Sequence, residues 1–325
     1  MPERKSAAVP RSVTVLLGGI NSESEVSLES GRRIMAALES LGYDVQAVYY
    51  EGDPAQAVAA LAGCDMVFIG LHGGDGEDGT VQAALEKAGL TFTGSGAKAS
   101  RLAMDKHASK RIMDEAGIAT PDWLVLDLPP GAPATSQGLP LLTDFSEIHG
   151  FPLVVKPNHE GSTVGVSIAH SQGRLDAALL LARAFGSRLL VEVYIPGREL
   201  TVTVLDGRAL PVVEIIPLSD FYDYDSKYRD GLSSYVVPAD LPQQTTLALQ
   251  EDAVRLYRAL GCRHYSRIDF RLTPRGTFRC LELNTLPGMT AHSLTPMAAQ
   301  AAGIAFPELV DMLVRMAWSR RNVTA

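Results

Sequence analysis

The chain has 325 residues, of which 46% are hydrophobic, and its 29 basic and 37 acidic residues give a formal net charge of −8. This composition is typical of a folded globular protein and excludes a disordered, collagen-like or coiled-coil chain. The length predicts roughly two or three domains, which leaves room for a cleft between lobes. Because the net charge is negative and no basic run offsets it, we expect neither nucleic acid nor an anionic membrane as a partner.

Cysteine use and the N-terminus predict a cytoplasmic protein. The three cysteines lie far apart and form no CxxC pair, which favours a reducing compartment. The apolar run 13–17 is too short for a signal peptide and ends in two glycines, so we expect no signal peptide here. Residues 1–11 are instead expected to be a flexible leader before the first buried strand. No stretch approaches the ~18 apolar residues of a membrane span.

The first hundred residues alternate between strand and helix patterns. Apolar strand patterns at 12–17, 44–50 and 65–70 are separated by a helical pattern that stops at Gly42 and by a short alanine-rich segment. This alternation predicts a parallel α/β domain.

The rest of the chain predicts two α+β units. Residues 106–191 begin with a helix that Asp105 could cap and continue, after a proline-rich loop, as strand, helix and strand. The residues beyond them look mostly antiparallel, with hairpin turns at Asp206-Gly207 and at 274–276. The predicted fold class is therefore α/β and α+β, with a parallel N-terminal sheet and a mostly antiparallel C-terminal sheet.

Polar side chains with oxygen atoms stand on the two strands of the second hairpin. Since side chains alternate along a strand, Arg267 and Asp269 share one face of the first strand, and Glu282 and Asn284 share one face of the second. Mg²⁺ prefers such oxygen ligands together with substrate phosphates. A solvated face with an Arg–Asp ion pair is the alternative, but the turn 285–290 offers backbone N–H groups beside the site and favours the metal.

A second group surrounds Lys156, which ends a predicted strand. The loop that follows, 158–165, contains Gly161, Ser162 and Gly165. An ammonium group and several backbone N–H groups could together bind phosphate oxygens. No Gly-Lys-Ser/Thr follows, so this is not a Walker A loop, and a simple hairpin connection is the alternative.

Two further candidates lie where the parallel strands end. His72 stands in the loop 71–80, whose four glycines would let a ligand approach the backbone, and Glu25 starts the helix after Gly18-Gly19. A structural histidine and a favourable charge in a first helical turn are the corresponding alternatives.

The segment 221–228 has four aromatic residues and Lys227, and it is too polar for a core strand. We expect a mobile lid that closes over the cleft, excludes water and brings Lys227 to a phosphate. An aromatic cluster on an edge strand is the alternative.

Seven motifs in a fixed order give these groups a common explanation. They are LLGGINSESEVSLESG, HGGDGEDGTVQ, TGSGAKASRLAMDK, VVKPNHEGSTVGVS, FYDYDSKY, RIDFRL and LELNTLPGMTAHSLTPMAA. The chain from Val13 to the last helix thus resembles the D-alanine:D-alanine ligases of bacterial cell-wall synthesis, which have the three-domain ATP-grasp fold. The resemblance implies an N-terminal substrate-binding domain at 1–105, a central domain at 106–191, and a C-terminal catalytic domain at 192–325 with a lid at about 219–235.

The activity that this resemblance implies is the ATP-dependent joining of two D-alanines into D-alanyl-D-alanine, through a D-alanyl phosphate, for peptidoglycan precursors. A carboxylate is a poor electrophile, so phosphorylation activates it, and the main task of the site is to stabilise charge. The family also implies two Mg²⁺ ions, for which Mn²⁺ can substitute, and a homodimer.

Residue roles follow from the same resemblance. Asp269, Glu282 and Asn284 would hold the metal ions. The nucleotide would be bound by Lys106, Lys156, Glu192, Val193, Ile195, Glu199 and Lys227. The substrates and the reacting atoms would be bound by Glu25, His72, Ser162, Tyr228, Arg267, Gly288 and Ser293.

Within the last set the expected roles differ. Glu25 would bind the ammonium of the first D-alanine, with His72 beside it, and Ser162 and Tyr228 would join Glu25 in a hydrogen-bonded triad that holds the lid closed. Arg267 and the Gly288 N–H would stabilise the tetrahedral oxyanion. Ser293 would bind the carboxylate of the second D-alanine. The resemblance does not identify the general base.

Four other functions compete with this one. Tyr228 and the aromatic lid favour an amine nucleophile over a D-alanine:D-lactate ligase. Another ATP-grasp carboxylate–amine ligase would differ at Glu25, Ser293 and the lid. A nucleotide-binding regulatory module would lack a metal ligand or Arg267. A dinucleotide oxidoreductase would need a G-x-G-x-x-G motif, which the first helix lacks.

Overall fold

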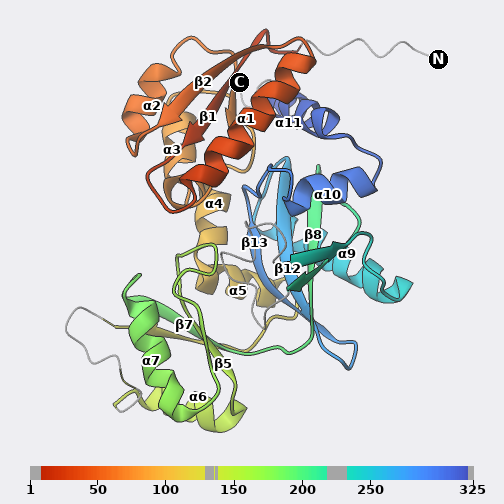
Figure 1. Cartoon of the computed structure of the whole chain (residues 1–325). Helices are drawn as coiled ribbons and strands as arrows, with labels where there is room; N and C mark the ends of the chain where they lie inside the picture. The colour runs from red at the N-terminus through yellow and green to blue at the C-terminus, as the bar shows by residue number, and fades with distance from the viewer. Residues whose placement is uncertain (1–8, 129–134, 136–137, 218–232, 321–325) are drawn as a thin grey trace.

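The computed structural model describes residues 9–128, 135, 138–217 and 233–320. These residues form three separate sheets, one parallel and two antiparallel (Figure 1). The predicted combination of α/β and α+β architecture is confirmed.

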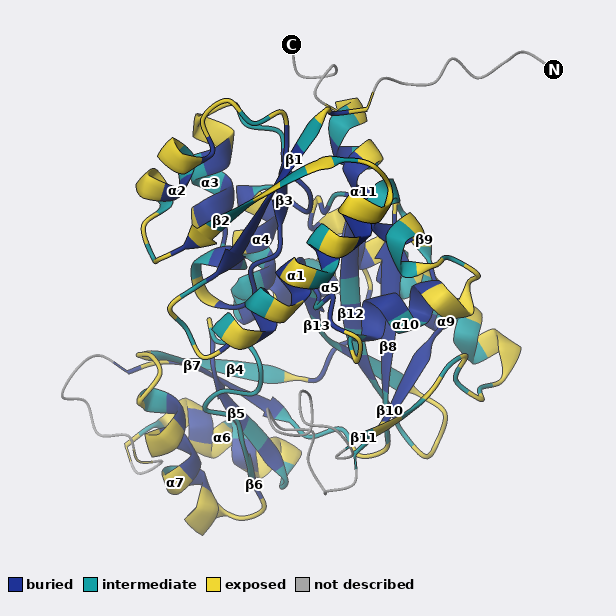
Figure 2. Ribbon diagram, turned by 45° about the horizontal axis from the view of Figure 1, so that its top comes forward, coloured by how far each residue is buried: buried dark blue, intermediate teal, exposed yellow. Residues whose placement is uncertain are grey.

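The N-terminal sheet is parallel and has the strand order β2-β1-β3. Its strands are β1 (Ser12–Gly18), β2 (Asp44–Tyr50) and β3 (Val67–Ile69). Its helical segments are α1 (Ser24–Ser40), α2 (Pro54–Ala60), the short 3₁₀ turn η1 (Gly74–Gly76), α3 (Thr80–Lys87) and α4 (Ala97–Met104). The apolar side chains of β1 are fully buried because helices cover both faces of the sheet (Figure 2).

A second sheet of four antiparallel strands has the order β4-β7-β5-β6. Its strands are β4 (Trp123–Asp127), β5 (Leu153–Pro157), β6 (Ser167–Ala169) and β7 (Arg188–Val193). Two helices, α6 (Pro140–His149) and α7 (Gln172–Arg183), complete a small core of their own with these strands.

The largest sheet has six antiparallel strands in the order β11-β10-β8-β12-β13, with β9 paired to β8. The strands are β8 (Arg198–Leu205), β9 (Arg208–Ala209), β10 (Val213–Pro217), β11 (Ser233–Val236), β12 (Tyr265–Leu272) and β13 (Phe278–Asn284). Both predicted hairpins are present, and Asp206 and Gly207 adopt the positive φ angles, 50° and 74°, that a tight hairpin turn requires.

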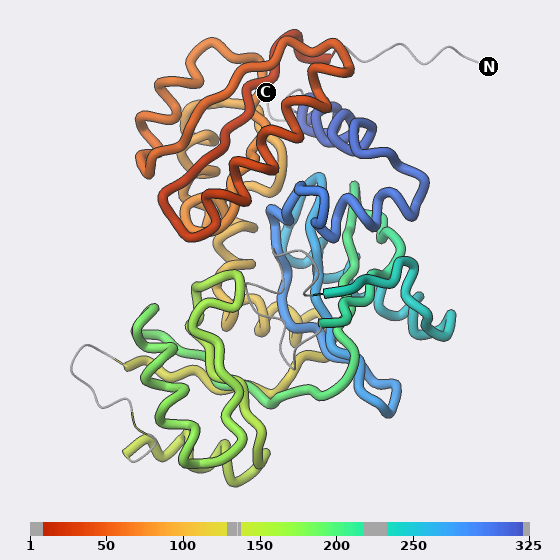
Figure 3. The backbone as a smooth tube through the Cα atoms, in the orientation of Figure 1, coloured from red at the N-terminus to blue at the C-terminus, as the bar shows by residue number. Residues whose placement is uncertain are grey.

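The other helices contact the largest sheet or the N-terminal helices. The remaining helices are α5 (Lys106–Glu115), α9 (Gln243–Ala259), α10 (Leu294–Ala301) and α11 (Phe306–Arg320). The α5 helix begins after Asp105, whose side chain caps it as predicted, and it packs against α9 and β13. Figure 3 follows the chain through the three sheets and shows α11 returning to lie beside α1. The expected domain boundaries stay a prediction.

In the described part of the chain, no single helix has the length and apolar character to cross a membrane. Helices α10 and α11 meet that criterion only when taken together, and they are bent by 102° relative to each other.

Candidate active site

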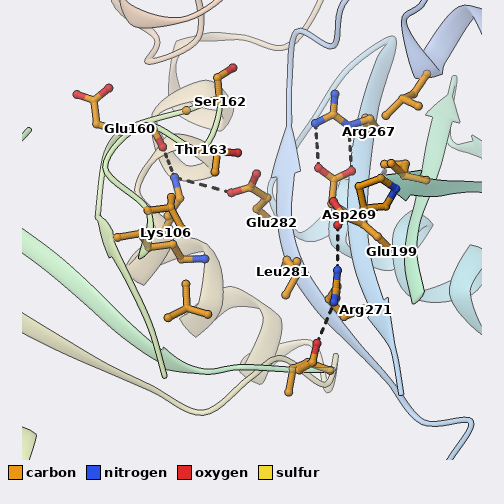
Figure 4. Close-up of a pocket in the computed structure, with 18 of the residues that line it drawn as sticks. Lys106, Glu160, Ser162, Thr163, Glu199, Arg267, Asp269, Arg271, Leu281 and Glu282 are labelled. Atoms are coloured by element: carbon orange, nitrogen blue, oxygen red, sulfur yellow. Dashed lines mark hydrogen bonds and ion pairs between the residues drawn. The ribbon is translucent and has the colours of Figure 1, made fainter. Parts of the chain in front are cut away.

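A pocket of about 190 Å³ lies between the four-stranded sheet and the six-stranded sheet. The four-stranded sheet contributes Lys156 and Glu192. The six-stranded sheet contributes Asp269 and Glu282, which are labelled in Figure 4. A smaller adjoining pocket shares Lys106, Arg267 and Glu282 with the larger one and extends to His72 of the N-terminal part. Side chains from all three sheets or their loops therefore meet at one place.

The predicted oxygen-bearing face of the β12–β13 hairpin is present. Asp269 pairs directly with Glu282, and Arg267 pairs directly with Asn284, so the four side chains lie on one face. Arg267 also forms a bidentate ion pair with Asp269, with Nε–Oδ1 and Nη2–Oδ2 distances of 2.9 Å (Figure 4). The Thr201 hydroxyl donates to Asp269 Oδ1 at 2.7 Å. The ion pair that was an alternative to the metal site is thus part of the same arrangement.

A β-bulge shapes this face. The pairing shifts by one residue between Asp269–Glu282 and Phe270–Cys280, so Leu281 is an extra residue on β13. Leu281 and Glu282 both line the pocket as a result.

Asn284 ends β13, and its side chain is held by the turn that follows. Its Oδ1 accepts a hydrogen bond from the Leu286 N–H at 2.8 Å. Asn284 lines the smaller pocket beside Glu282 and Gly288. The carboxylate and amide oxygens of the expected metal site therefore lie along one edge where the two pockets meet.

Two buried lysines from different elements point into the larger pocket. Lys106, the first residue of α5, donates from Nζ to the Glu160 carbonyl and lies 3.8 Å from Glu282 Oε2 (Figure 4). Burial lowers the pKa of Lys106, and Glu282 opposes this shift. Lys156 Nζ lies 2.5 Å from Glu192 Oε1. The site therefore combines ammonium groups with carboxylates at short range, as phosphate and metal binding together require.

The strand β7 and the residues after it form one wall. Glu192, Val193 and Ile195 all line the pocket, as does Glu199. The Val193 N–H donates to Asp122 O at 3.0 Å, and the Ile195 carbonyl accepts from Arg271 Nε at 3.1 Å. Arg271 also donates from Nη1 to Glu199 Oε2 at 2.9 Å.

The expected hydrogen bond between Ser162 and Glu25 is wrong, because Glu23 makes it. Ser162 Oγ donates to Glu23 Oε1 at 2.5 Å. Glu23 is 6% exposed and directly precedes α1, whereas Glu25 lies in the first turn and is exposed. The helical phase explains the difference: the buried face of α1 contains Val26, Ser27 and Ser30, and Glu23 lies three and four residues before the first two. The same phase could have identified Glu23 from the sequence.

His72 is buried, and protein groups contact both of its ring nitrogens. Nδ1 lies 3.1 Å from the Leu286 carbonyl, and Nε2 lies 3.0 Å from Ser30 Oγ. A carbonyl only accepts, so Nδ1 donates to Leu286, while Nε2 and the Ser30 hydroxyl form the second hydrogen bond. Ser30 Oγ also accepts the Met289 N–H at 3.2 Å. His72 and Ser30 together connect α1 to the segment that contains Gly288.

Gly288 and Ser293 are neighbours in space. A Cβ on Gly288 would lie 2.6 Å from Ser293 Oγ, so only glycine fits this position without a shift. Ser293 precedes α10, and its Oγ accepts the Thr290 N–H at 3.0 Å. Both residues line the larger pocket, and their expected roles at the reacting atoms stay a prediction.

The expected lid falls largely outside the described residues, and both Lys227 and Tyr228 lie there. Within the described ranges no group of three or more His, Cys, Asp or Glu residues is arranged to hold a metal ion. The expected metal set has two carboxylates and one amide, so it does not depend on such a group. Sequence reasoning missed Glu23, Thr201 and Ser30, of which only Glu23 has a signal in the sequence.

Comparison with known proteins identifies the family. The family model described as D-ala D-ala ligase C-terminus matches residues 112–315, and the one described as D-ala D-ala ligase N-terminus matches residues 51–95. The D-alanine--D-alanine ligase of Syntrophotalea carbinolica is 44% identical over 311 residues, which cover 96% of this chain and 97% of the relative. The D-alanine--D-alanine ligase of Gloeobacter violaceus is 45% identical over 304 residues, covering 93% and 98%.

Comparison with solved structures supports the same family. The D-alanine--D-alanine ligase of Bacillus anthracis complexed with ATP aligns with a TM-score of 0.84 at 33% identity, covering 98% of this chain and all of that one. The VanG D-Ala:D-Ser ligase of Enterococcus faecalis aligns with a TM-score of 0.80 at 28% identity, covering 95% and 99%. The chain therefore belongs to the D-alanine–D-alanine ligase family, and the predictions of an ATP-grasp fold and of an ATP-dependent ligase are confirmed.

Proposed function

We propose that the chain joins two D-alanine molecules into D-alanyl-D-alanine at the expense of ATP, with the nucleotide in the larger pocket and the amino acids where the two pockets adjoin. One observation carries this proposal: Lys106, Arg267 and Glu282 line both pockets. Cations and carboxylates at the junction of two pockets suit the transfer of a phosphoryl group from one ligand to another.

The nucleotide assignments follow from which backbone groups already have partners. The Val193 N–H and the Ile195 carbonyl are engaged, so the base edge is assigned to the Val193 carbonyl and the Ile195 N–H. Glu199, oriented by Arg271, accepts the ribose hydroxyls. Lys106 and Lys156 bind the phosphates, and Lys227 is assigned to the γ-phosphate.

The oxygen donors fit Mg²⁺, and Mn²⁺ as a substitute. Asp269 and Glu282 are directly opposite on neighbouring strands and Asn284 follows on the same face, which gives the hard oxygen ligands that Mg²⁺ prefers. These three residues would hold two ions. Bound Mg²⁺ would neutralise charge on the transferred phosphoryl group.

The reaction proceeds in two steps. The carboxylate of the first D-alanine attacks the γ-phosphorus and displaces ADP, which forms D-alanyl phosphate. The amine of the second D-alanine, after losing a proton, attacks the acyl carbon, and inorganic phosphate leaves. Arg267 and the Gly288 N–H stabilise the oxyanion between these events, and Ser293 binds the carboxylate of the second D-alanine.

The ammonium of the first D-alanine is assigned to Glu23 instead of Glu25. Glu23 reaches the loop that borders both pockets through Ser162, and Tyr228 is assigned to the same group. His72 is assigned the role of orienting the Leu286–Met289 segment, since its ring nitrogens contact Leu286 and Ser30.

A homodimer and a cytoplasmic location complete the proposal. All three cysteines are free thiols, which suits a reducing compartment that also supplies ATP. Light scattering of the purified protein tests the dimer, and a monomer at micromolar concentration would refute it.

The decisive experiment measures phosphate release from ATP with and without D-alanine. We expect release to depend on D-alanine and the product to be D-alanyl-D-alanine. Offering D-serine or D-lactate beside D-alanine at neutral pH tests the second substrate, for which the amine D-alanine should dominate. Release that ignores D-alanine would reject the function, and a dominant depsipeptide would reject the amine nucleophile.

A further inference from the structure

Lys110 is a buried lysine that lines neither pocket. It follows Lys106 by four residues on α5, so both side chains project from the same side of the helix. Lys106 enters the pocket from the first turn, whereas Lys110 lies one turn further on. One helix thus delivers one ammonium group to the ligand site and a second one outside it.

Three oxygen atoms surround the Lys110 ammonium. Nζ lies 2.9 Å from Glu192 Oε2, 2.7 Å from Thr120 Oγ1 and 3.2 Å from the Pro121 carbonyl. The Trp123 ring lies 5.4 Å away. The Thr120 hydroxyl and the Pro121 carbonyl accept hydrogen bonds from the ammonium, and Glu192 Oε2 forms an ion pair with it. Lys110 is therefore fixed in place and does not serve as a phosphate ligand.

Glu192 connects this fixed lysine to the pocket. It is 3% exposed, and its two carboxylate oxygens face different lysines, with Oε1 2.5 Å from Lys156 and Oε2 2.9 Å from Lys110. Burial raises the pKa of Glu192, but Lys110 and Lys156 outweigh this effect and hold it below the usual value. The carboxylate is therefore ionised and shared between a lysine inside the pocket and one outside.

Lys156 has two competing partners when a nucleotide binds, the Glu192 carboxylate and the phosphate oxygens. Its ammonium is paired with Glu192, yet it lines the pocket where phosphate oxygens would bind it. Leaving a buried carboxylate without a partner is strongly unfavourable. A second, permanent partner removes that obstacle.

We propose that Lys110 is a positioning residue for nucleotide binding, which keeps Glu192 paired while Lys156 turns from Glu192 to the phosphates of ATP. The inference rests on the proposed function, because it requires ATP in the larger pocket. Lys106, Lys110 and Lys156 all act electrostatically on Glu192, so three ammonium groups lie near its buried carboxylate.

The test uses Lys110→Met, which removes the charge and keeps an unbranched side chain of similar length. We expect the Kd for Mg-ADP, measured by calorimetry, to rise at least about tenfold, because Glu192 then retains Lys156. We expect kcat at saturating ATP to change less than about threefold, since Lys110 does not touch the reacting atoms. Lys98→Met, the same change at an exposed position on α4, should leave both values unchanged.

A second comparison separates this role from a purely structural one. In a Glu192→Gln background Lys156 no longer has a carboxylate to retain it, so adding Lys110→Met should alter the Kd less than about threefold. This double variant also keeps the test available if Lys110→Met alone does not fold.

Each outcome has one meaning. Wild-type protein that does not bind Mg-ADP would reject the proposed function itself. If the wild type binds and folded Lys110→Met has the same Kd, the inference about Lys110 is overturned. It is also overturned if the double variant binds more than tenfold more weakly than Glu192→Gln.

Discussion

The Ser162 hydroxyl lies 2.5 Å from Oε1 of Glu23, although 139 residues separate the two in the chain. Ser162 has a φ of 47° and Thr163 a φ of 65°, a left-handed conformation that costs energy for residues other than glycine. The same loop contains Glu160, whose carbonyl accepts from Lys106. The hydrogen bond to Glu23 therefore connects the N-terminal part of the molecule to a strained loop that lines the larger pocket.

Glu23→Gln tests the assignment of this carboxylate. The amide keeps a hydrogen-bond acceptor for Ser162 but loses the charge that would pair with the ammonium of the first D-alanine. A charge-assisted hydrogen bond contributes about 1.5–3 kcal/mol, so we expect kcat/KM for D-alanine to fall roughly 10- to 100-fold. The matched control is Glu25→Gln, two residues away and exposed, which should stay close to wild type. The reverse result would restore Glu25 to the role.

Removing charge from the oxygen-bearing face of β12 and β13 should abolish turnover without unfolding the protein. Asp269→Asn and Glu282→Gln keep the shape of each side chain, and we expect D-alanine-dependent phosphate release to fall at least about 100-fold. Titration with MgCl₂ should show that the variants need more metal. The control is Glu251→Gln on the exposed side of α9.

Chelation gives an independent check on the same face. EDTA should stop phosphate release by the wild type, and added Mg²⁺ or Mn²⁺ should restore it. A variant at Asp269 or Glu282 with wild-type circular dichroism and normal activity would contradict the metal assignment.

Much of the fold follows from local sequence patterns. Some features depend only on residues that are close together in the sequence, and they can be predicted from one segment at a time. They are the apolar runs of β1 and β3, the capping residue Asp105 and the turn at Asp206-Gly207. The oxygen-bearing face of β12 and β13 was predictable for the same reason, because a short turn connects the two strands of a hairpin. The bulge at Leu281 was not, since it depends on how the paired strands fit in the folded sheet.

Contacts between distant segments explain what the sequence could not reveal. Lys110 looks like an ordinary polar helix residue until Glu192, 82 positions later, is placed opposite it. Ser30 likewise acquires its role only when Met289 lies against α1. Glu23 is different, because the apolar phase of its own helix places it on the buried side.

Ser30→Ala tests whether α1 positions the segment that contains Gly288. The substitution removes the hydrogen-bond partner of His72 Nε2 and the acceptor of the Met289 N–H. Each such hydrogen bond contributes about 0.5–1.5 kcal/mol, so we expect kcat to fall roughly 3- to 10-fold while KM for ATP is unchanged. Ser40→Ala at the exposed end of the same helix is the control. An equal rise in KM for ATP would argue for a general loss of structure instead.

His264→Asn should make the protein less sensitive to mild acid. Burial, aided by the charges of Arg263 and Arg320, lowers the pKa of His264 to about 3 from 6.5. The unfolded chain therefore binds a proton at His264 near pH 6.5, whereas the folded chain binds it only near pH 3. The free energy of unfolding consequently falls as the pH drops from about 6.5 towards 3. The slope for one proton is about 1.4 kcal/mol per pH unit. His264 has a φ of 63° and accepts the Gly94 N–H, and asparagine tolerates this backbone while offering an acceptor.

Urea unfolding at pH 5, 6 and 7 measures the effect. The wild type should lose stability between pH 6 and pH 5 more steeply than His264→Asn, by close to the slope for one proton. Comparing the two proteins cancels the titration of all other groups, and His170→Asn at an exposed position should keep the wild-type slope. Parallel curves for wild type and His264→Asn would mean that His264 takes up its proton in the folded state, which its burial among Arg263 and Arg320 argues against.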